Sequence, residues 1–106
     1  MMLLTKENRK ALPPIGAQDG LGFDATAHVK FFTGGRYTFF ITEYDGADEL
    51  FGYCVSALGP DCDEWGYASL TELTALRGRF GQPMERDRYF APQTVREALA
   101  GGRVRA

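Results

Sequence analysis

Two runs of β-branched and aromatic residues on either side of Gly34-Gly35 constrain the fold of this chain more than any other feature. The runs cover residues 27–33 and 36–43. A Gly-Gly pair between such runs is typical of a tight hairpin turn, because glycine adopts positive φ angles without steric cost. The sequence therefore predicts an antiparallel β-hairpin. Because side chains alternate across a strand, three residues of the first run are expected to point into the core: Ala27, Val29 and Phe31.

Two further runs extend the predicted sheet. A turn at residues 45–48 leads into a third strand over residues 49–56, in which Gly52 marks a bulge or a close approach of another main chain. A second turn at residues 59–61 leads into a short fourth strand over residues 64–68, which we expect at the edge of the sheet. The sequence thus predicts a three- to four-stranded antiparallel meander.

Short helices are predicted at the N-terminus, after the sheet and at the C-terminus. Thr5 is a suitable N-cap for a first helix that ends before Pro13-Pro14. The other two helices each begin with the spacing of a capping box, in which a Ser or Thr side chain and a Glu side chain each accept from the other residue's main-chain N–H. The capping-box pairs are Ser69 with Glu72 and Thr94 with Glu97. We expect Gly101-Gly102 to end the last helix.

The composition fits one small domain. The chain has 106 residues, of which 44% are hydrophobic, and it contains eight Phe, five Tyr and one Trp, enough for one core. Residues 1–106 are therefore predicted to form a single α+β domain.

The apolar start, Met1 to Leu4, is too short for a signal peptide or a membrane span, so we expect a cytoplasmic protein with no membrane contact. In that compartment Cys54 and Cys62 would remain reduced.

Charge is distributed unevenly along the chain. The net charge is −2, yet residues 37–76 contain eight acids and no Lys or Arg, whereas residues 77–106 contain seven Arg against three acids, a local charge of +4. An acidic stretch interleaved with Tyr and Trp can attract a basic partner, since aromatic residues commonly anchor interfaces. The residues predicted to bind such a protein partner are Glu43, Asp45, Asp48, Glu49, Asp61, Asp63, Glu64 and Trp65. Exposed aromatic residues beside an edge strand leave both a monomer and a homodimer open.

The basic C-terminal third supports an alternative function. Four Arg lie close in sequence to Phe80, Tyr89 and Phe90, a composition that suits phosphate and base contacts. The candidate nucleic-acid or anion-binding residues are Arg77, Arg79, Arg86 and Arg88. A nucleic-acid-binding accessory protein is therefore the second hypothesis, although these Arg residues can equally pair with the acids of the chain itself.

The sequence offers little for catalysis or metal binding. His28 is the only histidine and is expected on the solvent face of its strand, and the spacing of Cys54 and Cys62 does not fit a structural zinc site. The sequence around Gly20 and Gly22 lacks the residues of a phosphate-binding loop. We therefore predict no cofactor, no metal and no catalytic residue. A small enzyme that uses His28 with a carboxylate remains a third hypothesis.

A series of short motifs runs in order through residues 3–99. Those of the first half are Leu3-Leu4-Thr5-Lys6-Glu7-Asn8-Arg9, Ala27-His28-Val29-Lys30-Phe31-Phe32-Thr33, Thr42-Glu43-Tyr44-Asp45-Gly46 and Phe51-Gly52. Those of the second half are Gly66-Tyr67-Ala68-Ser69-Leu70-Thr71-Glu72-Leu73, Arg77-Gly78, Gly81-Gln82-Pro83-Met84-Glu85-Arg86-Asp87 and Tyr89-Phe90. In this order they resemble the bacterial domain of unknown function 2958 family (DUF2958).

The resemblance implies a genetic setting but no activity. Proteins of this kind are encoded on plasmids, phages and other mobile elements, often beside anti-restriction or conjugation genes, which favours a counter-defence or accessory role by association. The leading hypothesis is accordingly a non-catalytic interaction protein, an inhibitor of host defence of the anti-restriction or anti-CRISPR type, that presents an acidic surface to a basic protein.

Overall fold

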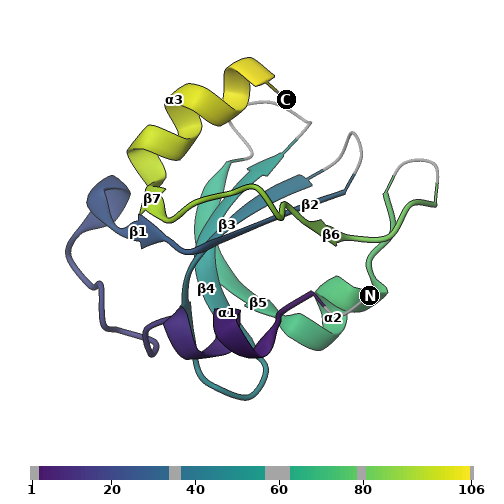
Figure 1. The fold of residues 1–106 in the computed structure, drawn as a ribbon, viewed down its shortest axis with the longest axis horizontal. Helices are drawn as coiled ribbons and strands as arrows, with labels where there is room; N and C mark the ends of the chain where they lie inside the picture. Colours follow the sequence, from purple (N-terminus) through teal and green to yellow (C-terminus); the bar gives the residue numbers. More distant parts are fainter. Residues whose placement is uncertain (1–2, 34–36, 57–62, 79–80, 106) are drawn as a thin grey trace.

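The computed structural model describes residues 3–33, 37–56, 63–78 and 81–105, with side chains described as far as Gly101. Its α+β architecture agrees with the fold class predicted from the sequence (Figure 1). The helices are α1 (Lys6–Ala11), the 3-10 helix η1 (Gly22–Asp24), α2 (Leu70–Ala75) and α3 (Val95–Arg105). The strands are β1 (Thr26–Ala27), β2 (Val29–Thr33), β3 (Tyr37–Tyr44), β4 (Glu49–Ser56), β5 (Glu64–Ser69), β6 (Glu85–Arg86) and β7 (Gln93–Thr94). None of the described helices is long and apolar enough to cross a membrane.

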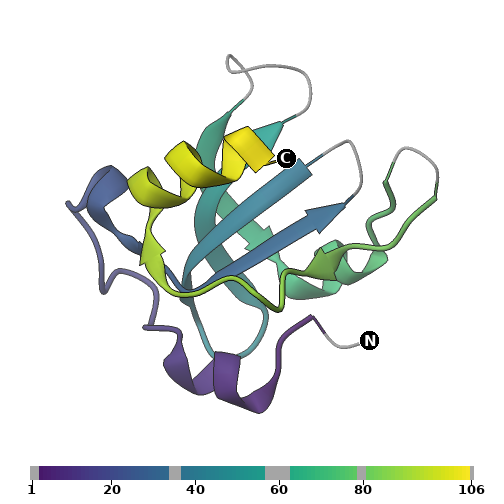
Figure 2. The same cartoon turned by 45° about the horizontal axis from the view of Figure 1, so that its top comes forward.

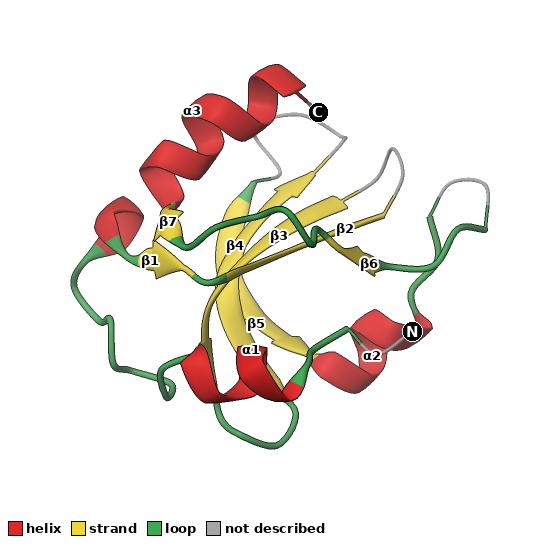
Figure 3. Cartoon of the chain, viewed as in Figure 1, coloured by secondary structure: helices red, strands yellow, loops and turns green. Residues whose placement is uncertain are grey.

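The main sheet has five antiparallel strands in the order β5-β4-β3-β2-β6 (Figure 3). Strands β2 to β5 form the predicted meander, and the turns predicted at Gly34-Gly35 and at residues 59–61 lie outside the described residues. The fifth strand, β6, pairs with β2 and comes from a segment that the sequence indicates only as charged and extended. Strands β1 and β7 pair separately in a two-stranded sheet. β5 is thus an edge strand of the main sheet, as predicted.

The sheet has a hydrophobic core on each face, with α1 and α2 on one side and α3 on the other (Figures 1 and 2). The first core contains Leu4, Phe31, Ile41, Leu50 and Leu73 among its buried residues. The second contains Ala27, Phe40, Val95 and Ala98, with Phe23, Tyr53 and Trp65 packed against it. Ala27, Val29 and Phe31 are all buried, but the prediction that they share one face is wrong for Ala27. The break between β1 and β2 at His28 interrupts the alternation, so Ala27 joins the second core.

Helix α1 is docked against the turn that connects β3 to β4. Thr5 caps the helix as predicted, with reciprocal hydrogen bonds to Asn8 of 3.0 Å each. From the last turn of the helix, Arg9 Nη1 donates to the Tyr44 hydroxyl (2.6 Å), and that hydroxyl donates to the carbonyl of Ala47 (3.0 Å). This relay fixes the β3–β4 turn relative to α1.

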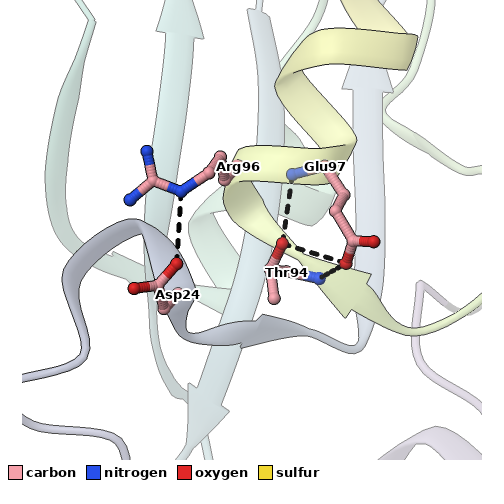
Figure 4. Close-up of polar contacts among 4 residues, drawn as sticks. All are labelled: Asp24, Thr94, Arg96 and Glu97. Carbon is pink, nitrogen blue, oxygen red and sulfur yellow. Dashed lines mark hydrogen bonds and ion pairs between the residues drawn. The ribbon is translucent and has the colours of Figure 1, made fainter.

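Helix α3 begins with the second predicted capping box, drawn in Figure 4. The Thr94 hydroxyl accepts from the main-chain N–H of Glu97 (3.1 Å), while the Glu97 carboxylate accepts from the main-chain N–H of Thr94 (3.0 Å). Arg96 beside it forms an exposed ion pair with Asp24 of η1 (3.2 Å), which contributes little because solvent screens it. The predicted end at Gly101-Gly102 is wrong. The helix continues to Arg105, since glycine weakens a helix without forbidding it.

A β-bulge in β3 changes which way its last residues face. The pairing with β4 runs regularly as far as Ile41 opposite Gly52, and then shifts so that Glu43 lies opposite Phe51. Thr42 is the extra residue, and its hydroxyl donates to the Phe51 carbonyl (3.0 Å). The bulge brings Glu43 to the same side of the sheet as Phe51, so both residues line one cavity.

Candidate functional site

The residues predicted to bind a protein partner do not form one surface. Asp45, Asp48 and Glu49 lie at the β3–β4 turn, whereas Asp63 and Glu64 lie at the opposite end of β5, about 17 Å away at 3.3 Å per strand residue. Glu43 is buried, with only 2% of its surface exposed, so it does not lie on an exposed acidic surface with the other predicted residues. Asp61 lies outside the described residues. The acidic stretch of the sequence is therefore divided by the fold.

Four carboxylates gather around one cleft of about 450 Å³, which we call the acidic cleft. Its main lining residues are Asp45, Asp48, Glu49, Tyr67, Ser69 and Glu72. None of the described residues that line it is basic. Tyr67, on the edge strand β5, is 64% exposed and so presents a large aromatic ring beside the acids. The predicted site set omitted Glu72 and Tyr67, which only the junction of β5 with α2 brings to this turn.

Asp45 organises the β3–β4 turn from its first position. One carboxylate oxygen, Oδ1, accepts from the main-chain N–H groups of Ala47, Asp48 and Glu49 at 2.8, 2.8 and 2.9 Å. These hydrogen bonds favour the charged form and hold the pKa of Asp45 below its ordinary value. The Asp45 side chain is exposed, so its charge reaches the solvent and the cleft.

Asp48 ties the turn to the start of α2. Its carboxylate accepts from the Ser69 hydroxyl (2.5 Å) and from both the hydroxyl (2.7 Å) and the main-chain N–H (2.8 Å) of Thr71. Hydrogen bonds from Ser69 and then Thr71 lower the pKa of Asp48. Asp48 thus supplies a carboxylate to the cap of α2.

The capping box predicted for Ser69 and Glu72 forms only in part. The Ser69 hydroxyl accepts from the main-chain N–H of Glu72 (3.2 Å), as expected. The reciprocal bond, from the main-chain N–H of Ser69 to the Glu72 carboxylate, is absent among the described residues, and the carboxylate that binds the start of this helix is that of Asp48. The Glu72 carboxylate consequently makes no hydrogen bond with a described residue and lines the cleft instead.

Glu43 anchors the loop that follows α1. Its two carboxylate oxygens accept from the main-chain N–H groups of Gly16 (2.8 Å) and Gln18 (2.7 Å). The side chain of Gln18 continues the network by bonding the main chain of Thr26 and the carbonyl of Thr42. Glu43 therefore has a structural role that the charge pattern alone does not reveal.

A second hollow lies between this loop and the sheet, with a volume of about 200 Å³. We call it the aromatic cavity, and the side chains that define it belong to Gln18, Asp19, Thr42, Glu43, Phe51 and Trp65. The rings of Phe51 and Trp65 are stacked, with centroids 5.8 Å apart and planes 14° from parallel. The ring of Phe51 also contacts Tyr67 of the acidic cleft, at 4.9 Å between centroids. The two hollows are thus adjacent across the Tyr67–Phe51 contact.

The far end of β5 has different properties. The Asp63 carboxylate accepts from the main-chain N–H of Ser56 (2.9 Å), and Glu64 is exposed opposite Cys54. Cys54 is a free thiol. Burial first, and then the charges of Asp63 and Glu64, raise the pKa of the Cys54 thiol to about 11. A thiol with so high a pKa is mostly protonated at neutral pH, so Cys54 is expected to be unreactive.

Cys54 is expected to exchange slowly with disulfide reagents. A pKa raised from 9.0 to about 11 lowers the thiolate fraction by two orders of magnitude, and the greater nucleophilicity of the remaining thiolate offsets about half of that on a logarithmic scale, leaving a rate about tenfold lower. The measurement is the reaction with a neutral dipyridyl disulfide in a Cys62→Ser variant, with the urea-unfolded protein as reference. Equal rates in the folded and unfolded proteins would contradict the assigned environment.

The Arg residues of the second hypothesis are partly engaged in the fold. Arg77 donates to the carbonyls of Thr74 and Leu76 at the end of α2 (3.1 Å each), and Arg86 donates to the carbonyl of Leu3 (2.7 Å). Arg88 is exposed, and Arg79 lies outside the described residues. Two of the four guanidinium groups thus donate hydrogen bonds to main-chain carbonyls. Nucleic-acid binding by these residues remains a prediction.

His28, on which the enzyme hypothesis depends, is only partly exposed. It lies between β1 and β2, and burial lowers the pKa of its imidazole. The imidazole makes no hydrogen bond with any described residue, so no carboxylate of the described chain orients it. Within the same described ranges, no three His, Cys, Asp or Glu side chains are arranged to hold a metal ion.

Comparison with known proteins gives one match. The model of a family described as a protein of unknown function (DUF2958) matches residues 3–100, which is nearly the whole chain. No curated protein and no solved structure matches.

Proposed function

The chain belongs to the DUF2958 family, a family of unknown function, and we propose that it is a non-catalytic interaction module that binds a basic protein surface through the acidic cleft. The observation that carries the proposal is the convergence of four carboxylates beside an exposed tyrosine, with no basic residue among those described around them. Complementary charge increases the rate of encounter and excludes partners of the wrong sign.

The hydrogen bonds within the cleft divide its acids into two groups. Asp45 and Asp48 are fixed by main-chain and hydroxyl donors, so they provide charge at defined positions. Glu49 and Glu72 are exposed and make no hydrogen bond with described residues, so they are available to a partner. Tyr67 supplies the amphipathic ring that commonly anchors an interface. The arrangement thus combines fixed charge, free charge and an aromatic anchor.

We propose further that the partner is a component of a host defence system, which is the role suggested by the mobile-element setting of similar proteins. Nucleases and DNA-binding subunits carry basic surfaces that match phosphate rows, and an acidic protein surface competes for the same contacts. The four carboxylates of the cleft support a partner with a positively charged surface. The defence role is supported only by the resemblance, and so it requires its own test.

The first experiment is affinity capture from a host lysate, followed by charge reversal. A tagged protein is incubated at low and high salt, the retained proteins are identified by mass spectrometry, and affinities are then measured with the purified partner. Because the side chains of Glu49 and Glu72 are exposed and make no hydrogen bond with a described residue, the double variant Glu49→Lys/Glu72→Lys should fold normally and weaken binding at least about tenfold. Salt should weaken the binding of the unmodified protein as well.

The control reverses the same number of charges elsewhere. Glu7 in α1 and Glu85 in β6 are exposed acids outside the cleft, so Glu7→Lys/Glu85→Lys changes the net charge equally. Binding should survive in this variant with only a small loss. If the two double variants lost the same affinity for the partner, net charge alone would explain the loss. That result would contradict a defined binding site. Retention of nucleic acid alone would instead favour the Arg residues.

A further inference from the structure

We propose that the aromatic cavity binds the guanidinium group of an arginine side chain from the partner protein. The inference deepens the proposed function and rests on it for the source of the arginine. It concerns a separate hollow, however, lined by Glu43, Phe51 and Trp65 rather than by the acids of the cleft. The hydrogen-bonding groups of the cavity that remain unused determine which ligand it favours.

Apart from the indole N–H of Trp65, the hydrogen-bonding capacity that remains among the cavity side chains is that of acceptors. The Gln18 amide is occupied, since its Nε2 donates twice and its Oε1 accepts once, and the Thr42 hydroxyl donates to a carbonyl. Each Glu43 oxygen accepts one main-chain hydrogen bond, so each retains a second lone pair. The Asp19 carboxylate makes no hydrogen bond with a described residue and lines the same cavity. Carboxylate oxygens thus make up most of the unused capacity, which favours a positively charged donor as the ligand of this cavity.

The charge of Glu43 is unbalanced by any described side chain. It is 98% buried, and neither of the two described ion pairs, Lys30 with Asp87 and Arg96 with Asp24, involves it. Buried carboxylates are commonly paired with a cation, because main-chain donors alone leave the charge uncompensated. An arriving guanidinium would supply the missing positive charge together with a planar set of donors that matches a carboxylate.

The walls and the size of the cavity favour a single arginine side chain. The nearly parallel rings of Phe51 and Trp65 line the cavity, and a planar guanidinium stacks on an aromatic ring better than a tetrahedral ammonium does. The volume of about 200 Å³ is below the range of about 300–1,000 Å³ that is usual for small-molecule sites. A cofactor is too large for this space, whereas the end of one side chain fits.

The position of the cavity links it to the acidic cleft. Tyr67 lines the cleft, Phe51 lines the cavity, and their rings are in contact at 4.9 Å. A basic segment that crosses Tyr67 would place one arginine against Glu43 and the next basic residues against Glu49 and Glu72. The cavity would thus determine the register of the partner, while the cleft would contribute general attraction.

The test uses blocked amino acids rather than the partner itself. Trp65 is the only tryptophan of the chain and lines the cavity, so its fluorescence reports occupancy directly. N-acetylarginine amide should change the emission saturably, and N-acetylcitrulline amide, which has nearly the same shape without the charge, should bind at least about tenfold more weakly. N-acetyllysine amide should also bind more weakly, because its ammonium does not stack.

Point variants assign the signal to the cavity. Asp19→Asn removes an exposed carboxylate of the cavity and should lower the affinity for the arginine probe about threefold. Glu85→Gln in β6 should leave that affinity unchanged. Equal binding of the three probes, or no saturable response to the arginine probe, would overturn the proposal. Because the probe contains no partner protein, that failure is distinct from a failure of Glu49→Lys/Glu72→Lys to weaken partner binding.

Discussion

Replacement of Gly52 by alanine is expected to lower the free energy of unfolding by about 3 kcal/mol, the upper end of the usual cost of overpacking. A Cβ atom at this position would lie 2.1 Å from the carbonyl oxygen of Phe40, 2.9 Å from the carbonyl carbon of the same residue and 3.0 Å from the Cα of Ile41. All three atoms belong to the main chain of β3, so no side-chain rotation relieves the clash. The central pair of strands would have to separate, which disturbs both cores.

Gly66 provides a matched control, because it lies directly opposite Gly52 in the neighbouring strand. A Cβ atom on Gly66 would meet no atom within 4 Å, and its φ is not positive. Gly66→Ala should therefore change stability by less than about 1 kcal/mol and may be measured in the same urea titration. A small effect of Gly52→Ala, comparable to that of Gly66→Ala, would show that the close approach of β3 to β4 is not present in solution.

The sheet could be predicted from local patterns because its strands have strong ones. Alternating and aromatic runs identified β2, β3 and β4, and Gly52 was expected to mark either a bulge or a close approach. The structure shows that Gly52 marks the approach, while the bulge lies opposite it at Thr42. Strand β6 has only two residues, and its pairing depends on β2 rather than on its own composition. A strand of that length leaves no periodic signal.

The acidic cleft could be predicted only in part, because a sequence does not show which way a charged side chain points. The bulge at Thr42 turns Glu43 into the protein, although Asp45, two residues later, is exposed. Glu72 lines the cleft instead of completing the capping box, while Asp48, from the β3–β4 turn, binds Ser69 and Thr71 at the start of α2. Such exchanges depend on contacts between residues far apart in the chain. That acidic residues gather near the β3–β4 turn followed from the sequence, but which of them line the cleft required the fold.

Glu43→Ala should lower the free energy of unfolding by about 3 kcal/mol, since it removes two hydrogen bonds to a charged acceptor, each worth roughly 1.5–3 kcal/mol, and part of that loss is recovered by water in the cavity left behind. The main-chain N–H groups of Gly16 and Gln18 would lose their acceptors. The loop after α1 would then detach from the sheet before the rest of the domain unfolds. Emission of Trp65, which lines the same cavity, should shift toward that of a hydrated indole.

Glu43→Gln separates the hydrogen bonds from the volume of the side chain. A glutamine retains one acceptor oxygen but places an NH₂ group against the other main-chain N–H, so a loss of about 2 kcal/mol is expected. Glu49→Gln makes the same chemical change on an exposed acid and should alter stability by less than about 0.5 kcal/mol. Urea titrations of the three variants, followed by circular dichroism and by Trp65 fluorescence, measure both effects. If Glu43→Gln were as mild as Glu49→Gln, Glu43 would not anchor the loop, and its buried charge would have to be held by contacts other than Gly16 and Gln18.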